Sequence, residues 1–156
     1  MNKKQKEMLN DYVLHSALHM ITLEEQYLRK TCEKDLSLRE LHVLEAVSTL
    51  EDSRKNTMAE IARYLRLSPA SLTTAVNVLV KKNYLVREYS SNDRRVIYVN
   101  LTETGRDANA KYLEFVKKMI GFIGKDLDEA AADGMIEALL KANEYLENPE
   151  ESEEEN

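Results

Sequence analysis

The sequence predicts a mainly α-helical protein with one small β-hairpin, and two observations lead to this expectation. Residues 57–83 read as two short amphipathic helices separated by a tight turn, and residues 85–101 read as two strands joined by a polar segment. Helix, turn, helix and hairpin, in that order, make a winged helix-turn-helix. Such a unit can place one helix in the major groove of DNA and the hairpin loop in the minor groove.

The first helix of the pair is expected to begin at Thr57. Thr57-Met58-Ala59-Glu60 matches a capping box, in which the Thr hydroxyl and the Glu carboxylate each accept a hydrogen bond from a free backbone N–H. Ile61, Ala62 and Leu65 give this helix a short apolar face. Arg66-Leu67 is long enough only for a tight turn.

The second helix has two distinct faces. Ser68 is suited to cap it, and Pro69 occupies the first turn, where the missing N–H costs nothing. The apolar residues at helical spacing are expected to face the core, namely Leu72, Val76, Leu79 and Val80. Small and polar residues dominate the outward face, and those expected to contact DNA are Ser68, Ala70, Ser71, Thr73, Thr74, Asn77 and Lys81. An ordinary solvated helix face is the alternative, but no acidic residue occurs between Ser68 and Val86, which favours contact with nucleic acid.

The hairpin follows at once. Asn83 suits the left-handed residue that ends a helix, and Leu85–Tyr89 and Val96–Leu101 are expected as strands. Two adjacent arginines in the loop, Arg94 and Arg95, suit a narrow and electronegative minor groove. Asp93 makes sense beside them if it braces one arginine by a paired hydrogen bond. The alternative is a solvated loop with an incidental ion pair.

Several stretches together resemble the MarR family of bacterial transcription regulators. They are Leu36 through Leu44, Ala59 through Ala62, Ser71 through Thr73, Lys81 through Leu85, Asn92 through Val96 and Leu101 through Arg106. The resemblance implies a homodimer that binds double-stranded DNA, most often as a repressor on a palindromic operator. It also implies that Asp93 orients Arg95 and that Arg95 enters the minor groove. Asn83 departs from the family pattern, which commonly has Gly there, but Asn also tolerates a positive φ.

A narrower resemblance points to the repressors of fatty-acid synthesis genes in Gram-positive bacteria. It rests on Leu23-Glu24-Glu25, Leu28-Arg29, Lys34-Asp35 and the stretch from Ser37 through Glu40 to His42. In that branch, acyl carrier protein bearing a long acyl chain acts as the co-effector. A regulator that responds to a small phenolic or other lipophilic ligand is the alternative. The sequence identifies neither the ligand-binding residues nor the operator.

Charge is distributed unevenly along the chain. The net charge is −6 overall, but residues 54–106 carry ten Lys or Arg against four Asp or Glu. The basic charge is therefore concentrated on the segment assigned to DNA, as binding by counterion release requires. Residues 147–156 hold six glutamates and are expected to form a disordered acidic tail.

The remaining composition predicts one cytoplasmic domain over residues 1–146. The chain has a single cysteine, Cys32, no apolar run long enough to span a membrane, and an N-terminus that does not read as a secretion signal. Within the domain, residues 36–101 are expected to form the DNA-binding lobe. Residues 5–31 and 102–146 are expected to form long helices whose apolar faces pair two protomers into an intertwined dimer. A monomer with a self-contained helical core is the alternative.

A few histidine, cysteine and tyrosine residues could form a metal, redox or ligand site. His15 and His19 have the helical spacing of a zinc pair, but no histidine follows His42, so no metal site is expected. Cys32 suits a packed thiol better than a redox sensor. Tyr12 and Tyr27 fit either a ligand pocket or simple packing.

No catalytic constellation or nucleotide-binding loop is recognisable in the sequence, so neither an enzyme nor a cofactor is expected. A winged helix that binds a protein partner is the rival class. Such a protein would not need two arginines in the wing beside a helix face without acids.

Overall fold

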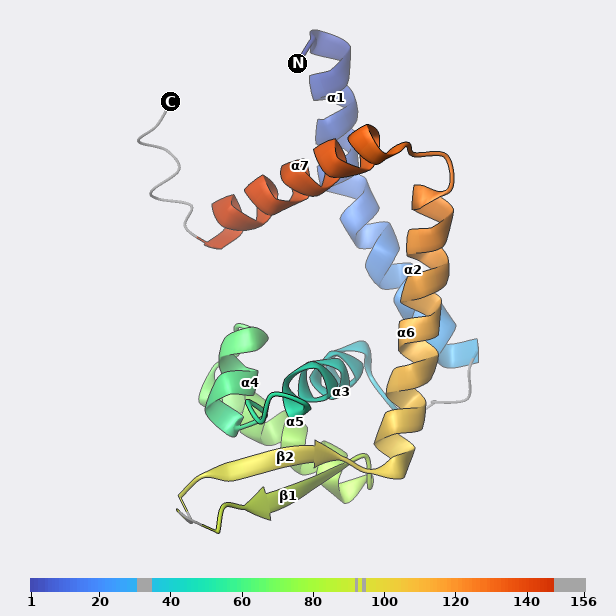
Figure 1. Ribbon diagram of the computed structural model, residues 1–156. Helices are drawn as coiled ribbons and strands as arrows, with labels where there is room; N and C mark the ends of the chain where they lie inside the picture. Colours follow the sequence, from blue (N-terminus) through green and yellow to red (C-terminus); the bar gives the residue numbers. More distant parts are fainter. Residues whose placement is uncertain (31–34, 92, 94, 148–156) are drawn as a thin grey trace. The chain divides into compact units, whose positions relative to one another are not determined.

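The computed structural model describes residues 1–30, 35–91, 93 and 95–147, without the side chains of residues 17 and 29 (Figure 1). The elements in chain order are α1 (Lys3–Asp11), η1 (Tyr12–Ser16), α2 (Ala17–Lys30), α3 (Leu38–Glu51), α4 (Met58–Tyr64), α5 (Pro69–Lys81), β1 (Leu85–Tyr89), β2 (Ile97–Leu101), α6 (Glu103–Gly124) and α7 (Glu129–Glu147). The chain divides into two compact units, Met1–Phe115 and Val116–Asn156. Helices dominate, and a single two-stranded hairpin is present among the described residues, as the sequence predicted.

The N-terminal segment is helical from Lys3 to Lys30, which agrees with the expected long helix over residues 5–31 as far as residue 30. Asn2 and Gln5 form a capping box at its start. The sequence did not predict the π-helical stretch η1 in the middle of this segment. In a π-helix each backbone hydrogen bond spans five residues, one more than in an α-helix. His15, in this stretch, lies 3.0 Å from Asp11 through its Nδ1 atom.

Helix α2 packs against α3 and the first part of α6. Leu28 is buried, and the Tyr112 hydroxyl of α6 donates a 2.8 Å hydrogen bond to the Glu24 carboxylate of α2. Burial and this hydrogen bond raise the pKa of Tyr112 well above its ordinary value, so the hydroxyl stays a donor. Tyr27 stacks on Phe115 with 4.7 Å between ring centroids, a contact within this unit.

Three helices, α3 to α5, lie over the hairpin and form the core of the lobe (Figure 1). The most deeply buried side chains come from all of these elements: Leu41, Val43, Leu44, Val47, Ile61, Leu72, Val76, Leu79, Leu85 and Val99. Each such side chain stabilises the fold by about 1.5–3 kcal/mol relative to exposure.

Hydrogen-bonding side chains set where these helices begin. Ser37 and Glu40 form a complete capping box at α3, and Ser68 accepts the Ser71 N–H at α5. At α4 the predicted capping box is half present. The Thr57 hydroxyl accepts the Glu60 N–H at 3.3 Å, but the Glu60 carboxylate accepts from Arg63 within the same helix.

The hairpin is antiparallel, with Leu85 opposite Leu101 and Tyr89 opposite Ile97. Strand β1 has the predicted bounds, whereas β2 begins one residue later than predicted. Val96 belongs to the turn, because its N–H donates to the Asp93 carbonyl and its carbonyl accepts from Ser90. Residues 56 and 57 lie beside β2 and form an isolated β-bridge with it, in which the Val99 N–H donates to the Asn56 carbonyl.

The turn between α5 and β1 is clamped by the start of α6. Asn83, just after α5, has a φ of 64°, the left-handed conformation predicted for this residue. The Thr102 hydroxyl lies 2.7 Å from the Asn83 carbonyl and 3.1 Å from that of Tyr84. Gly105 passes so close that a Cβ there would lie 2.2 Å from the Tyr84 carbonyl oxygen. Thr102 and Gly105, within the stretch Leu101 through Arg106, therefore have roles in packing this turn.

The second unit contains the end of α6 and α7. The Asp128 side chain accepts the Ala131 N–H at 2.8 Å and so caps the start of α7. Large apolar side chains of this unit are exposed: Ile120, Phe122, Ile123, Met135, Ile136, Leu139, Leu140 and Leu146. In the described part of the chain, every helix is too short or too polar to cross a bilayer.

Candidate nucleic-acid interface

Helix α5 separates its two faces as the sequence predicted. Leu72, Val76 and Leu79 are fully buried, and Val80 is half-buried at the edge of the core. The opposite face is exposed at every candidate position except Ser71, which is half-buried: Ser68, Ala70, Thr73, Thr74, Asn77 and Lys81. These side chains form one outward-facing surface, here called the reading face.

The hydroxyl groups on the reading face are already used as donors. Thr73 donates to the Pro69 carbonyl at 2.8 Å, and Thr74 donates to the Ala70 carbonyl at 3.1 Å. The Ser68 hydroxyl donates to the Ser71 hydroxyl at 2.9 Å. The two threonines therefore offer methyl groups and oxygen lone pairs to a ligand, which suits thymine methyls and amino groups on base edges.

Asn77 is held by a residue that the sequence did not single out. Arg87 of β1 donates a 2.7 Å hydrogen bond to the Asn77 Oδ1 atom. This contact orients the amide, so that its N–H₂ group remains available as a donor. The strand pattern could have indicated this contact. Arg87 lies two residues after the buried Leu85, so both side chains point to the same face of the hairpin, and a charged side chain on that face needs a partner.

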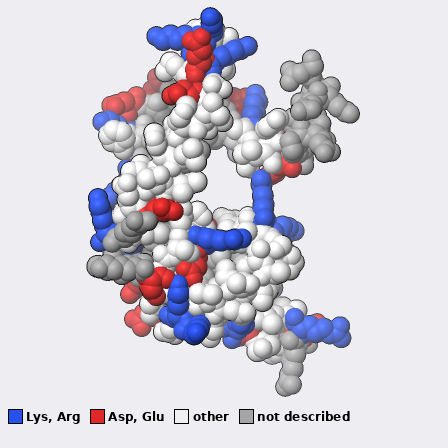
Figure 2. Space-filling view, turned by 180° about the vertical axis from the view of Figure 1, so that it is seen from behind, with Lys and Arg blue, Asp and Glu red and all other residues white. Residues whose placement is uncertain are grey.

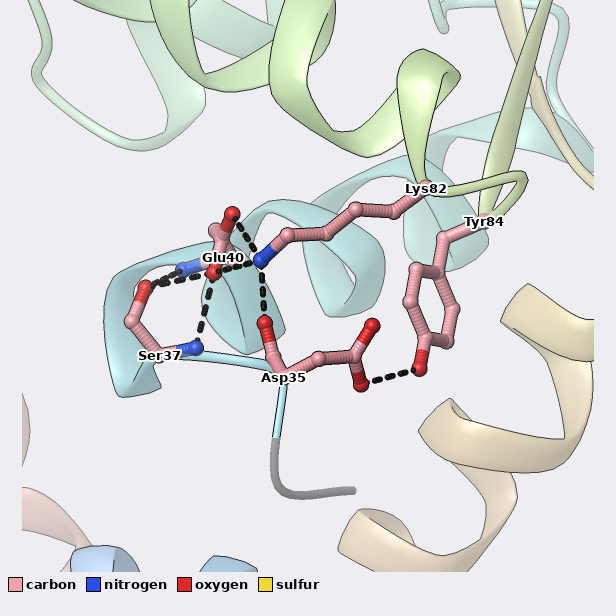
Figure 3. Close-up of polar contacts among 5 residues, drawn as sticks. All are labelled: Asp35, Ser37, Glu40, Lys82 and Tyr84. Carbon is pink, nitrogen blue, oxygen red and sulfur yellow. Dashed lines mark hydrogen bonds and ion pairs between the residues drawn. The ribbon is translucent and has the colours of Figure 1, made fainter.

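Lys81, the last residue of α5, and Lys82, which follows it, point in different directions. Lys81 is exposed on the reading face, as predicted. Lys82 turns toward α3, where its Nζ atom lies 2.9 Å and 3.0 Å from the two Glu40 carboxylate oxygens (Figure 3). Of these two lysines, Lys81 is therefore the one placed to meet a phosphate.

The wing presents Arg95 at its tip with the side chain 96% exposed. Asp93 acts on it differently from the predicted paired hydrogen bond. The Asp93 carboxylate accepts the backbone N–H of Arg95 at 2.9 Å, while the two side chains are 4.0 Å apart. Asp93 thus shapes the turn that carries Arg95. Arg94 lies outside the described residues.

The end of the hairpin carries positive charge. Figure 2 shows blue atoms, which mark Lys or Arg, at this end, at the lower right of that view. The reading face contributes no carboxylate, and Asp93 is the one acidic residue between positions 89 and 101 of the sequence. An exposed cationic tip beside a neutral polar helix face is suited to a polyanion.

The described histidines and Tyr12 do not contribute to this surface. His42 lies 3.9 Å from Glu24 and against the Tyr112 ring, and His19 is exposed on α2. Tyr12 is half-exposed in η1. Cys32 lies outside the described residues, so its role stays a prediction.

Comparison with known proteins agrees with the fold. A family model described as MarR family matches residues 34–96. The uncharacterized HTH-type transcriptional regulator YwhA of Bacillus subtilis is 32% identical over 83 residues, which are 53% of this chain and 51% of that protein. Transcriptional regulator AdcR of Streptococcus pneumoniae is 38% identical over 76 residues, 49% of each chain. The chain thus spans about half the length of the curated relatives it matches.

Solved structures extend the likeness beyond the lobe. Streptococcus pneumoniae FabT, in complex with DNA, is 26% identical with a TM-score of 0.81, covering 93% of this chain and 99% of that chain. The S. aureus MepR–DNA complex has a TM-score of 0.72 over 87% of this chain and 95% of that chain, and its 19% identity shows the fold alone. The family model thus matches the winged-helix lobe, and the likeness in fold to FabT reaches nearly the whole chain, so the chain is similar to MarR-family regulators.

Proposed function

We propose that this protein is a sequence-specific DNA-binding transcription regulator that acts as a homodimer, in the manner of a repressor, on a palindromic operator. The observation that carries the proposal is the exposed, acid-free reading face of α5 beside the exposed Arg95 of the wing. Helix donors and acceptors of this kind read base edges in the major groove, and an arginine at a loop tip suits the minor groove. The FabT structure, which contains DNA, supports the proposal by its similarity over the whole fold.

Dimerisation is proposed from the apolar surface of the long helices. Leu9, Val13 and Ile21 in the first unit are about half exposed, and α7 buries none of its residues. Water-exposed apolar area on this scale is usually covered by a partner, and a second copy related by a two-fold axis is the usual one. Two reading faces would then meet successive major grooves, with half-site centres about 10–11 base pairs apart.

The effector is proposed to be acyl carrier protein bearing a long acyl chain. The sequence resemblance to repressors of fatty-acid synthesis genes supports this. A regulator of the same family that answers to a small lipophilic ligand is the alternative. Titrating the operator complex with each class of ligand separates the two, because only the true effector changes the affinity for DNA.

Arg95→Ala is expected to weaken binding to the preferred duplex by about 1–3 kcal/mol, as for the loss of one well-placed groove contact. The fold should be unaffected, because this side chain is almost fully exposed. Fluorescence anisotropy with a labelled duplex measures the loss, and thermal unfolding checks the fold.

Asp93→Ala provides the matched test of the wing. It removes a negative charge, so a simple charge model expects tighter binding. We expect weaker binding, because the Arg95 N–H loses its acceptor and the turn loosens. Tighter binding of DNA by Asp93→Ala at ordinary salt would contradict this role.

Asn77→Ala is expected to change which sequence the protein prefers, whereas Lys81→Ala should lower affinity for all duplexes alike. The amide of Asn77 can hydrogen-bond to base edges, but a lysine at the helix end contacts phosphate. Selection from a pool of random duplexes, followed by sequencing, measures both effects. An unchanged preferred site with uniformly lower affinity would remove Asn77 from the base-reading residues.

A further inference from the structure

Lys82 makes its contacts inside the lobe rather than toward a ligand. Its ammonium group donates to both carboxylate oxygens of Glu40 and to the backbone carbonyl of Asp35 (Figure 3). An ammonium group has three donors, and all three therefore have acceptors within the protein. The side chain of Lys82 is 27% exposed and that of Glu40 only 12%. Lys81, one residue earlier, is exposed on the reading face.

The acceptors of Lys82 are themselves firmly held. The Glu40 carboxylate accepts the Ser37 backbone N–H at 2.8 Å and the Ser37 hydroxyl at 2.9 Å, as part of the cap of α3. Burial raises the pKa of Glu40, but hydrogen bonds from Ser37 and Lys82 outweigh it, so that the pKa lies below its usual 4.5. The carboxylate is consequently ionised at neutral pH and can hold the lysine.

A second contact joins the same two segments. The buried Tyr84, two residues after Lys82, donates a 2.9 Å hydrogen bond to the Asp35 carboxylate (Figure 3). Residues 82–84 form the turn that ends α5 and begins the wing, while residues 35–40 begin α3. The turn is thus attached to the start of α3 on one side and to Thr102 on the other. Both DNA-facing elements, the reading face and the wing, emerge from this attached turn.

We propose that Lys82 is a positioning residue for DNA recognition, which holds the end of α5 and the base of the wing on the start of α3 without touching nucleic acid. This inference rests on the proposed function. A partly buried ion pair is a weak source of net stability, because desolvation offsets most of its attraction, but it fixes geometry when all its partners are satisfied. Contacts with base edges depend on geometry to within about 0.5 Å. The effect of Lys82 should therefore appear in selectivity.

The experiment compares Lys82→Met with the matched control Lys81→Met in the full chain. Affinity is measured for the duplex that the wild-type protein selects from a random pool and for a random duplex, between about 50 and 200 mM salt. Loss of a phosphate contact lowers the slope of log affinity against log salt by about 0.9. We expect that loss for Lys81→Met, with its preference for the selected duplex retained.

Lys82→Met is expected to behave in the opposite way. The salt slope should stay that of the wild type, while the ratio of selected to random affinity should fall about tenfold, as for one lost base contact. A reduced salt slope would identify Lys82 as a phosphate contact and overturn the inference. An unchanged slope with an unchanged ratio would overturn it as well.

A double variant separates positioning from a merely structural role. Lys82→Met leaves the Glu40 charge poorly compensated and should lower the unfolding midpoint, whereas Lys82→Met with Glu40→Gln removes both charges and should recover it. The amide oxygen introduced by Glu40→Gln can still accept from Ser37, so α3 keeps its cap. We expect selectivity to stay low in the double variant. Recovery of selectivity together with stability would show that Lys82 acts only through the fold.

The wild-type protein decides between failure of this inference and failure of the proposed function. A wild-type chain that selects no duplex from the pool would overturn both. Selection by the wild type, with equal changes in salt slope for the two lysine variants, would overturn only the positioning role of Lys82.

Discussion

Deletion of residues 1–31 is expected to abolish operator binding while removing none of the side chains on the reading face or the wing. The deleted helices carry exposed apolar residues that we assign to the dimer interface. A single lobe makes half of the base contacts and should retain only weak, non-specific affinity, with a Kd on the order of 10⁻⁴ to 10⁻⁶ M. Anisotropy with the selected duplex measures the affinity, and light scattering measures the oligomeric state.

A point variant controls for damage to the lobe, because α2 also contributes the buried Leu28 and the Glu24 carboxylate that Tyr112 contacts. Val13→Asp changes a side chain that is 62% exposed and leaves those contacts intact. We expect it to weaken the dimer and the operator complex together, whereas Gln26→Asp, at an exposed polar position of α2, should leave both unchanged. A soluble, monomeric 32–146 fragment that bound the operator at full affinity would refute the dimer-based mechanism.

Gly105→Ala is expected to destabilise the fold by about 1–3 kcal/mol, the usual cost of overpacking a close contact. The added methyl group would lie 2.2 Å from the Tyr84 carbonyl oxygen, which is backbone and cannot rotate away. Either α6 or the turn that carries the wing must then shift, so operator affinity should fall as well. Denaturant unfolding followed by circular dichroism measures the stability.

Gly121→Ala is the matched control in the same helix. A Cβ at Gly121 meets nothing within 4 Å. Alanine there should therefore stabilise α6 by about 0.5–1 kcal/mol, because it favours the helix more than glycine does. Equal stability of the Gly105 and Gly121 variants would contradict the packing reason for Gly105.

Local patterns in the sequence were sufficient to predict most of the lobe. The spacing of Leu72, Val76 and Leu79 identifies the buried side of α5, because one period of a helix fits within a few residues. Thr57 and Ser68 mark helix starts, and Asn83 marks a helix end, since each role depends on a single side chain and its nearest backbone. Such signals can be read without knowing the fold.

The remaining features depend on partners far away in the sequence. Lys81 and Lys82 are chemically identical neighbours, and nothing local distinguishes them. The partner of Lys82, Glu40, is 42 residues away and is itself involved in a capping box. Arg87 similarly meets Asn77 only once β1 packs beside α5. The π-helical stretch η1 has no recognised sequence signal, and the start of β2 was misplaced because Val96 completes the loop.

If Asn77 reads base edges as proposed, its hydrogen bond with Arg87 should bias the bases that it prefers. An asparagine that recognises adenine in the usual two-bonded way uses both its carbonyl and its amide group. Here Arg87 already donates to the carbonyl oxygen, which keeps one further lone pair, while the N–H₂ group keeps its two donors. While that bond persists, we expect Asn77 to act mainly as a donor toward acceptors such as guanine N7 and O6 or thymine O4. The selection experiment with Asn77→Ala should accordingly relax preference at a guanine or thymine position of the half-site.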